Sequence, residues 1–161
     1  MSCQLAMITD VMLITQEKSV AEAMTLFEKH RIKGLPVVDS EGKLIGLFTL
    51  VHLLKRLLPD VAVLENLPRV HHFDVSLGSL SGSMSDVAAR LVHLKELKVG
   101  DLMVKPDTVR ADMPLQEGIR LLVKYGSPIP VIERDSSHKL TGIITSQSII
   151  KALNTIQTSG K

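Results

Sequence analysis

Two threonines, Thr49 and Thr145, are the residues of this sequence best placed to bind an anion. Each follows a short apolar run typical of a strand and precedes apolar residues at helical spacing, so each is expected to cap a helix. The hydroxyl of such a cap lies beside helix amides that have no intrahelical partner, and a nucleotide phosphate fits that environment. Helix capping explains both threonines equally well without any ligand.

The two threonines belong to an internal repeat. Residues 35–39 (LPVVD) return at 129–133 (IPVIE), and residues 43–49 (KLIGLFT) return at 139–145 (KLTGIIT). Two copies of one pattern fold as two similar supersecondary units, so we expect two half-cores packed face to face. The expected ligand site is the cleft between them.

Each copy is expected to contain a capped helix, two strands and a second helix. Residues 19–22 (SVAE) have the pattern of a capping box, and Pro114 suits the first position of the equivalent helix. Residues 40–42 separate two apolar runs, a pattern typical of a β-hairpin. Pro36 and Pro130 cannot donate a ladder hydrogen bond, so we expect them at a strand start or at a sheet edge.

A further strand is expected to lead into each copy, over residues 11–15 in the first and 108–110 in the second. Residues 10–12 (DVM) resemble residues 101–103 (DLM), which suggests that these triplets are equivalent. The first copy is shorter after this triplet than the second. Whether Val11 and Met12 end a turn or begin the strand is therefore left open.

The sequence divides into a first repeat at 1–58, a linker or insertion at 59–97 and a second repeat at 98–161. Pro59, Pro68 and the Gly/Ser-rich residues 78–82 are typical of loops. Residues 85–97 have apolar side chains along one helical face and predict a helix. A connection of this length usually has a function or is mobile.

These motifs resemble a tandem pair of CBS domains, named after cystathionine β-synthase, which together form a Bateman module. The resemblance rests on the proline-containing strand, the Lys-Leu-x-Gly strand that ends in threonine, and the capped helix before them, each present twice. It covers roughly residues 8–58 and 98–157. It implies an α+β fold in which two β-α-β-β-α repeats pack sheet to sheet with pseudo-two-fold symmetry.

The resemblance also implies a function. CBS pairs generally have no catalytic activity of their own; they bind AMP, ADP, ATP or S-adenosylmethionine between the repeats and signal to a partner protein. They often associate as disc-like homodimers. In the family, the residue three positions after the threonine is commonly an aspartate that accepts both ribose hydroxyls. This chain has His52 and Ser148 there, and loss of a charged acceptor costs about 1.5–3 kcal/mol.

The candidate ligand-binding residues are those that the two copies are expected to bring to the cleft. Apolar residues before the prolines and on the lead-in strands could flank a purine, and basic residues before the first proline could contact phosphates at the first copy's end. Ordinary packing and solvation explain these residues without a ligand. The complete set is Leu13, Arg31, Lys33, Leu35, Pro36, Thr49, His52, Thr108, Ile129, Pro130, Thr145 and Ser148.

Composition argues against several other functions. The net charge of +2 is too small to favour binding to DNA or to a membrane, and aromatic residues, at 2%, are too few to stack single-stranded nucleic acid. The one cysteine, Cys3, cannot form an internal disulfide, and no apolar run could span a bilayer, so we expect a cytoplasmic protein. No residues resemble a catalytic triad or a carboxylate pair, so we expect no enzyme activity. His71, His72 and Asp74 could ligate a metal, but no second cluster at metal-site spacing supports this, so we expect no metal.

Two functions remain. The first is a regulatory module that senses an adenosyl nucleotide, suggested by the paired threonines and the duplicated cleft. The alternative is a dimerisation or protein-interaction module without a ligand, suggested by the absence of the family's aspartate at His52 and Ser148.

Overall fold

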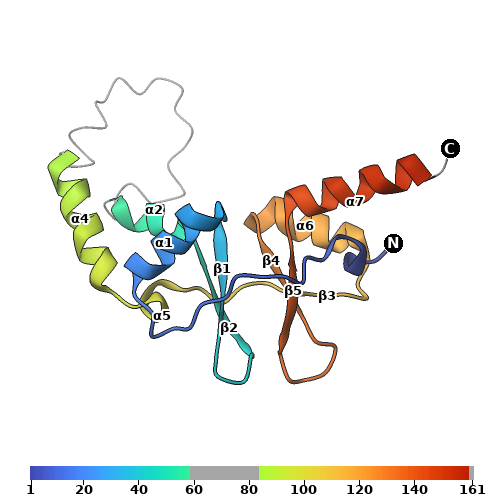
Figure 1. The fold of residues 1–161 in the computed structure, drawn as a ribbon, viewed down its shortest axis with the longest axis horizontal. Helices are drawn as coiled ribbons and strands as arrows, with labels where there is room; N and C mark the ends of the chain where they lie inside the picture. The colour runs from blue at the N-terminus through green and yellow to red at the C-terminus, as the bar shows by residue number, and fades with distance from the viewer. Residues whose placement is uncertain (59–83, 160–161) are drawn as a thin grey trace.

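The computed structural model describes residues 1–58 and 84–159 (Figure 1). Its elements are η1 (Cys3–Ala6), α1 (Val20–His30), β1 (Gly34–Val38), β2 (Leu44–Thr49), α2 (Leu50–Leu57), α4 (Met84–Glu96), α5 (Val99–Leu102), β3 (Val109–Arg110), α6 (Leu115–Tyr125), β4 (Ile129–Ile132), β5 (Leu140–Ile144) and α7 (Ser146–Ser159). The α+β fold predicted from the sequence is confirmed. The strand pairs β1–β2 and β4–β5 stand side by side in the centre, with α1 and α2 beside the first and α6 and α7 beside the second (Figure 1).

Both repeats are built on an antiparallel hairpin, as predicted. Gly34 of β1 is paired with Thr49 of β2, and Ile129 of β4 with Ile144 of β5. Both hairpins shift register at the same place, between the third and fourth positions of the valine-rich motif, at Val37/Val38 and Val131/Ile132. The repeated sequence therefore specifies the same irregularity twice.

The prediction that the two prolines lie at a strand start or a sheet edge is wrong. Pro36 and Pro130 lie inside β1 and β4, and each strand has a neighbour on both sides. Ile14 donates to the Pro36 carbonyl at 3.1 Å, and Val38 donates to the Ile14 carbonyl at 3.0 Å. The parallel pairing at Ile14 uses the Pro36 carbonyl as an acceptor. It ends before it would require a hydrogen bond from the Pro36 nitrogen, which carries no hydrogen.

The lead-in strands are shorter than expected. In the first repeat only Ile14 forms a bridge, to Val37, and in the second repeat β3 contains two residues. Pro114 also differs from its prediction, because it precedes the first residue of α6 as the N-cap. The capping box at the start of α1 is present: Ser19 Oγ accepts from Glu22 N at 3.1 Å, and the Glu22 carboxylate accepts from Ser19 N at 2.9 Å.

The two repeats exchange their first segments. Ile8, at the start of the first repeat, forms an antiparallel bridge to Ile143 of β5 in the second repeat. Val104, near the start of the second repeat, forms the same bridge to Leu47 of β2 in the first. Residues 9–13 and 105–108 then cross between the sheets in opposite directions, as the blue and yellow segments of Figure 1 show.

This exchange corrects the expected equivalence of residues 10–12 with 101–103. Met7 is the counterpart of Met103, because each lies over the glycine of the opposite repeat's Lys-Leu-x-Gly strand. A Cβ built on Gly142 would lie 2.7 Å from Met7 Cγ, and one built on Gly46 would lie 2.5 Å from Met103 Sδ. Only glycine leaves room for the methionine, which explains why the motif contains it twice.

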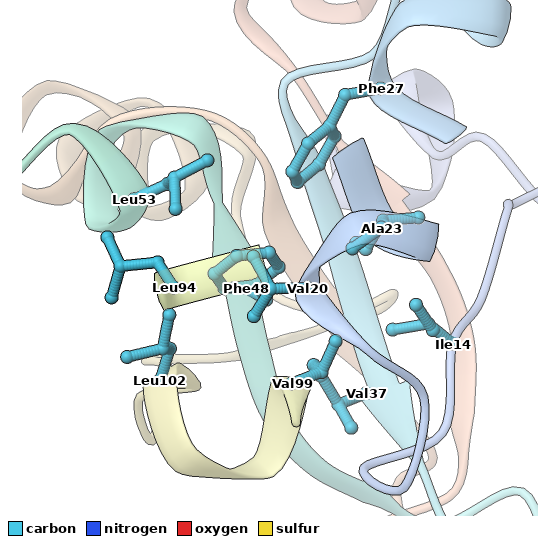
Figure 2. Close-up of a cluster of buried hydrophobic side chains, with 11 residues drawn as sticks. Ile14, Val20, Ala23, Phe27, Val37, Phe48, Leu53, Leu94, Val99 and Leu102 are labelled. Atoms are coloured by element: carbon cyan, nitrogen blue, oxygen red, sulfur yellow. The ribbon is translucent and has the colours of Figure 1, made fainter. Parts of the chain in front are cut away.

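Each hydrophobic core is completed by the exchanged segment. The first core contains Leu94 from α4 and Val99 and Leu102 from the start of the second repeat, packed near Phe48 and Val20 (Figure 2). The second core contains Cys3 and Ala6 from the start of the chain. Full burial of a large apolar side chain contributes about 1.5–3 kcal/mol. Neither repeat therefore closes its core with its own residues alone.

The helix expected at 85–97 corresponds to α4, whose Leu94 enters the first core. Arg90 Nη1 donates to the Leu57 carbonyl at 3.2 Å, which attaches α4 to the end of α2. The remaining residues of the expected insertion, 59–83, lie outside the described residues. Within the described ranges, no helix has the length and apolar character needed to cross a membrane.

Candidate functional site

The two threonines singled out from the sequence cap α2 and α7. Thr49 Oγ1 accepts from His52 N at 3.2 Å, and Thr145 Oγ1 accepts from Ser148 N at 3.0 Å. In return, His52 Nδ1 accepts from Thr49 N at 3.3 Å, and Ser148 Oγ accepts from Thr145 N at 2.9 Å. Both junctions are reciprocal capping boxes, with His and Ser in the place that Glu or Gln usually takes.

The caps therefore use the side chains of the two residues proposed to replace the family's aspartate. Ser148 Oγ also donates to the Thr145 carbonyl at 3.0 Å, so the hydroxyl both donates and accepts within its own turn. Its hydrogen is no longer available to a ligand. The sequence did not reveal this role, because a T-x-x-H or T-x-x-S pattern is not a usual capping signature.

The surroundings of His52 favour its neutral form. Burial and the nearby Lys55 lower its pKa, and the Leu47 main chain acts in the opposite direction. A neutral imidazole can accept at Nδ1, whereas the protonated ring has two donors and no acceptor. The hydrogen bond from Thr49 N thus requires the state that burial favours.

A cleft of about 340 Å³ lies between the repeats beside Thr145. One wall is the crossing segment, and a second is the loop that joins α1 to β1. The strand–helix junction of the second repeat forms the rest. The lining residues are Ile8, Asp10, Val11, Met12, Arg31, Ile32, Lys33, Gly34, Ser127, Pro128, Ile143, Thr145, Ser146 and Gln147. Clefts of this size and mixed lining are typical of small-molecule sites.

The charged side chains of the cleft come from the first repeat, whereas the threonine that lines the same cleft belongs to the second repeat. Arg31 and Lys33 line the same cleft as Thr145, and so does Asp10. We expected these basic residues to lie at the first copy's end of the ligand cleft. The structure corrects this, because they line the cleft beside the threonine of the second repeat. The pseudo-two-fold relation places the α1–β1 loop of one repeat against the strand–helix junction of the other.

Arg31 has a backbone conformation that favours glycine. Its φ is 50°, in the left-handed region, and Gly126 at the end of α6 has a φ of 86°. An L-residue in this region costs about 1–2 kcal/mol relative to right-handed backbone. An arginine is thus retained at the cleft at some cost to stability, a feature that is frequent at functional sites.

The other junction is closed more tightly by the main chain. Thr49 is only 8% exposed, and Leu50 N, the first amide of α2, donates to the Lys33 carbonyl at 3.0 Å. Gly34 permits close contact between the repeats here, because a Cβ built on it would lie 2.5 Å from Pro128 Cδ. The two junctions therefore share a capping pattern but differ in their surroundings.

The remaining sequence-predicted residues lie elsewhere. Leu35, Pro36, Ile129 and Pro130 are buried in the interior. Leu13, 41% exposed, faces a separate groove of about 470 Å³ along α1, and Thr108 is half-buried just before β3.

The structure thus brings three of the twelve predicted residues into the cleft. These are Arg31, Lys33 and Thr145. Among the residues that sequence reasoning missed, Asp10 stands out as a charged group. It was interpreted as part of a repeated Asp-x-Met triplet, and only the register of the crossing segment shows that it faces the cleft.

Comparison with known proteins agrees with this architecture. The model of the CBS domain family matches the chain twice, over residues 3–59 and 99–155. The chain belongs to the CBS domain family. It thus has two CBS repeats, as the sequence motifs predicted.

The relatives that the chain matches differ in how much of their length it covers. It is 31% identical over 157 residues to the chloroplastic CBS domain-containing protein CBSX1 of Arabidopsis thaliana, with 94% of this chain and 62% of that protein aligned. It is 26% identical to protein MJ1426 of Methanocaldococcus jannaschii, with 93% and 92% aligned. It is 29% identical to the inosine-5'-monophosphate dehydrogenase of the same organism, but spans only 22% of that enzyme.

Solved CBS pairs share the fold. The structure of CBSX2 from Arabidopsis thaliana superposes with a TM-score of 0.72 at 23% identity, covering 98% of this chain and 96% of that one. CBSX2 in complex with AMP gives a TM-score of 0.67 at 24% identity, covering 97% and 98%. The CBS pair of MJ0100, in complex with 5'-methylthioadenosine and S-adenosyl-L-methionine, gives 0.63 at 21% identity, covering 96% and 97%.

Proposed function

We propose that this chain is a cytoplasmic regulatory module that binds an adenosyl nucleotide at the Thr145 cleft and signals its occupancy to a partner protein. The observation that carries the proposal is the cleft of about 340 Å³ in which Arg31 and Lys33 meet Thr145. No catalytic step is part of the proposal. Complexes of CBSX2 with AMP and of MJ0100 with S-adenosyl-L-methionine support the ligand class.

The charges of the cleft favour a phosphate-bearing ligand. Two cationic side chains from one repeat face the start of a 14-residue helix in the other. Helix amides and cationic side chains both stabilise a phosphate. A nucleotide bound there contacts both repeats at once, which gives a physical route from occupancy to the relative position of the repeats.

Calorimetric titration and thermal melting with AMP, ADP, ATP and S-adenosylmethionine test the proposal. A ligand present at 100 times its dissociation constant stabilises the folded state by about 2.7 kcal/mol. We expect heat and a raised melting temperature for AMP, ADP or ATP. The absence of both at millimolar concentration of all four ligands would contradict the proposed function.

A matched pair of substitutions tests the position of the site. Thr145→Ala and Thr49→Ala each remove one equivalent cap, which costs about 0.5–2 kcal/mol of stability in either case. Only Thr145→Ala is expected to weaken AMP binding, because Thr145 alone lines the charged cleft. Equal losses of AMP affinity in the two variants would argue against this assignment.

We also propose that the module is a homodimer, formed through the outer faces of α2 and α7. Leu54 and Ile150 are equivalent in the two repeats, and both are 59% exposed. Val51 and Leu58 extend the face on α2, at 57% and 45% exposed. A second copy would present the same two-part apolar face in return, as a two-fold interface requires.

Light scattering tests the dimer. The Leu54→Glu/Ile150→Glu double variant is expected to be a monomer at micromolar concentration if wild type is a dimer. Leu13→Glu changes an apolar residue that is 41% exposed and lies off this face, so it should leave the mass unchanged. A monomeric wild type at micromolar concentration would refute the dimer.

The second candidate function is a ligand-free interaction module. The use of His52 and Ser148 within their own capping boxes favours it, since neither junction then offers the family's ribose acceptor. Ser148→Asp and His52→Asp restore the acid. If neither variant gains affinity for AMP and wild type also fails to bind it, the interaction module is the better description.

A further inference from the structure

We propose that Asp10 supplies the acceptor for the ribose hydroxyls in the Thr145 cleft, and that nucleotide binding is confined to this one of the two pseudo-symmetric clefts. The inference rests on the proposed function and adds to it a specificity-determining residue and a stoichiometry. It places the acceptor on the crossing segment instead of on the helix that follows Thr145.

Ser148 cannot fill this role in the observed arrangement. Its hydroxyl accepts from Thr145 N at 2.9 Å and donates to the Thr145 carbonyl at 3.0 Å. The side chain also lines a different groove, between η1 and α7, and is not part of the Thr145 cleft. A ribose in the cleft therefore needs another acceptor.

Asp10 has the chemistry and the position for this task. It lies on the crossing segment just after the bridge at Ile8 and lines the cleft with Arg31 and Lys33. Within residues 1–58 and 84–159, its carboxylate forms no hydrogen bond and no ion pair, so both oxygens can accept. A carboxylate can receive both hydroxyls of a vicinal diol. The two cations of the cleft are likewise outside the ion pairs found in the described part of the chain.

The positions equivalent to these three charged groups, beside Thr49, are all uncharged. Val104 makes the bridge equivalent to that of Ile8, and the residue two positions later is Pro106 in place of Asp10. Gly126 and Ser127 stand where the first copy has Arg31 and Lys33. The next acid along, Asp107, lies one residue beyond the position equivalent to Asp10. The charge set suited to a nucleotide thus occurs once.

Calorimetry with AMP and with 2',3'-dideoxy-AMP tests the role of Asp10. Asp10→Asn should weaken AMP binding about tenfold and leave the dideoxy analogue nearly unaffected, because the lost contact involves the hydroxyls. Asp107→Asn is the matched control, with the same change of charge in the other crossing segment, and should bind AMP as wild type does. Circular dichroism and melting temperature verify the fold of each variant.

The outcomes separate the inference from the proposed function. If wild type binds AMP and Asp10→Asn binds it equally well, or loses both ligands to the same extent, the role of Asp10 is refuted while the proposed function stands. A stoichiometry of two AMP per chain refutes the confinement to one cleft. If wild type binds none of the nucleotides, both the proposed function and this inference fail.

Discussion

The junctions at Thr49 and Thr145 have the same local design and different surroundings. Both are strand–helix turns closed by a reciprocal capping box. Beside Thr145 lie Asp10, Arg31 and Lys33, whereas the equivalent positions on the Thr49 side hold the uncharged residues Pro106, Gly126 and Ser127. The duplication preserves the hydrogen-bonded scaffold, and the charged residues that distinguish the clefts stand on the connecting segments. Connections tolerate changes in length and type that strands and caps do not.

A second lesson of the comparison concerns folding. The first segment of each repeat forms a β-bridge to the other repeat and contributes residues to its hydrophobic core. The repeats are thus similar in outline but depend on each other for closure. We expect them to unfold as one cooperative unit, and the first prediction tests this.

The largest effect is expected for Phe48→Ala, which removes a fully buried ring packed 5.6 Å from that of Phe27. Loss of a buried phenylalanine costs about 3–5 kcal/mol. If the exchanged segments couple the repeats, hydrogen exchange should accelerate in α6 of the second repeat as well as in α1. Val92→Ala, at a residue 62% exposed on α4, is the control and should change stability little. Faster exchange confined to the first repeat would show that the repeats are independent.

A smaller effect is expected for Arg31→Gly, which makes the two α-helix ends alike. AMP affinity should fall about tenfold with the loss of a charge-assisted contact, while the melting temperature stays equal or rises because the left-handed strain is relieved. The reciprocal Gly126→Arg variant should lose about 1–3 kcal/mol of stability, since Gly126, with a φ of 86° and a ψ of −179°, lies in a region that essentially only glycine adopts. Calorimetry and denaturant unfolding measure the two effects. A destabilised Arg31→Gly variant would show that the arginine has a structural role instead.

A further difference between the junctions should appear as a pH dependence. The pKa of His52 in the folded state lies below its ordinary value of 6.5, because burial and Lys55 disfavour the charged ring. The unfolded chain therefore binds the proton more readily. The contribution of this cap is complete above about pH 6.5 and is lost as the pH falls below that value towards the folded-state pKa.

His52→Ser gives the first junction the side chain of the second and isolates this effect. Wild type should lose stability relative to His52→Ser between pH 7 and pH 5, by less than the roughly 1 kcal/mol that an entire N-cap contributes. Urea unfolding at a series of pH values measures the difference, and titrations of other histidines cancel in it. A constant difference over this range would contradict the requirement for neutral His52.

The smallest effect is expected at the hairpin ends, where the repeats meet again. Lys43 and Lys139 face each other in an antiparallel bridge, flanked by hydrogen bonds of 3.0 and 3.2 Å. Like charges opposite each other destabilise a strand pair, so Lys139→Glu should raise stability by about 0.2–1 kcal/mol. The Lys43→Glu/Lys139→Glu double variant restores like charges and should lose this gain. A gain that persists in the double variant would exclude the cross-repeat pair as its cause.

Much of this fold was predictable because it depends on local interactions. The capping box of α1, the two hairpins and the caps at Thr49 and Thr145 involve partners a few residues apart, and their side-chain types are visible in the sequence. The hairpins and the threonine caps each occur in both repeats, so one copy supports the prediction for the other. The family likewise followed from these motifs.

Only the tertiary structure decided which residues share the cleft. The exchange of first segments is a non-local pairing that depends on the fit of Met7 over Gly142 and of Met103 over Gly46. It makes Met7, and not Met12, the counterpart of Met103, so residues 10–12 are not equivalent to 101–103. That register brings Asp10 to Arg31 and Lys33 in the cleft beside Thr145. Sequence alone determined the repeated scaffold through short-range hydrogen bonds and through its apolar strand and helix patterns. The pseudo-two-fold packing of the repeats determined where their charges meet.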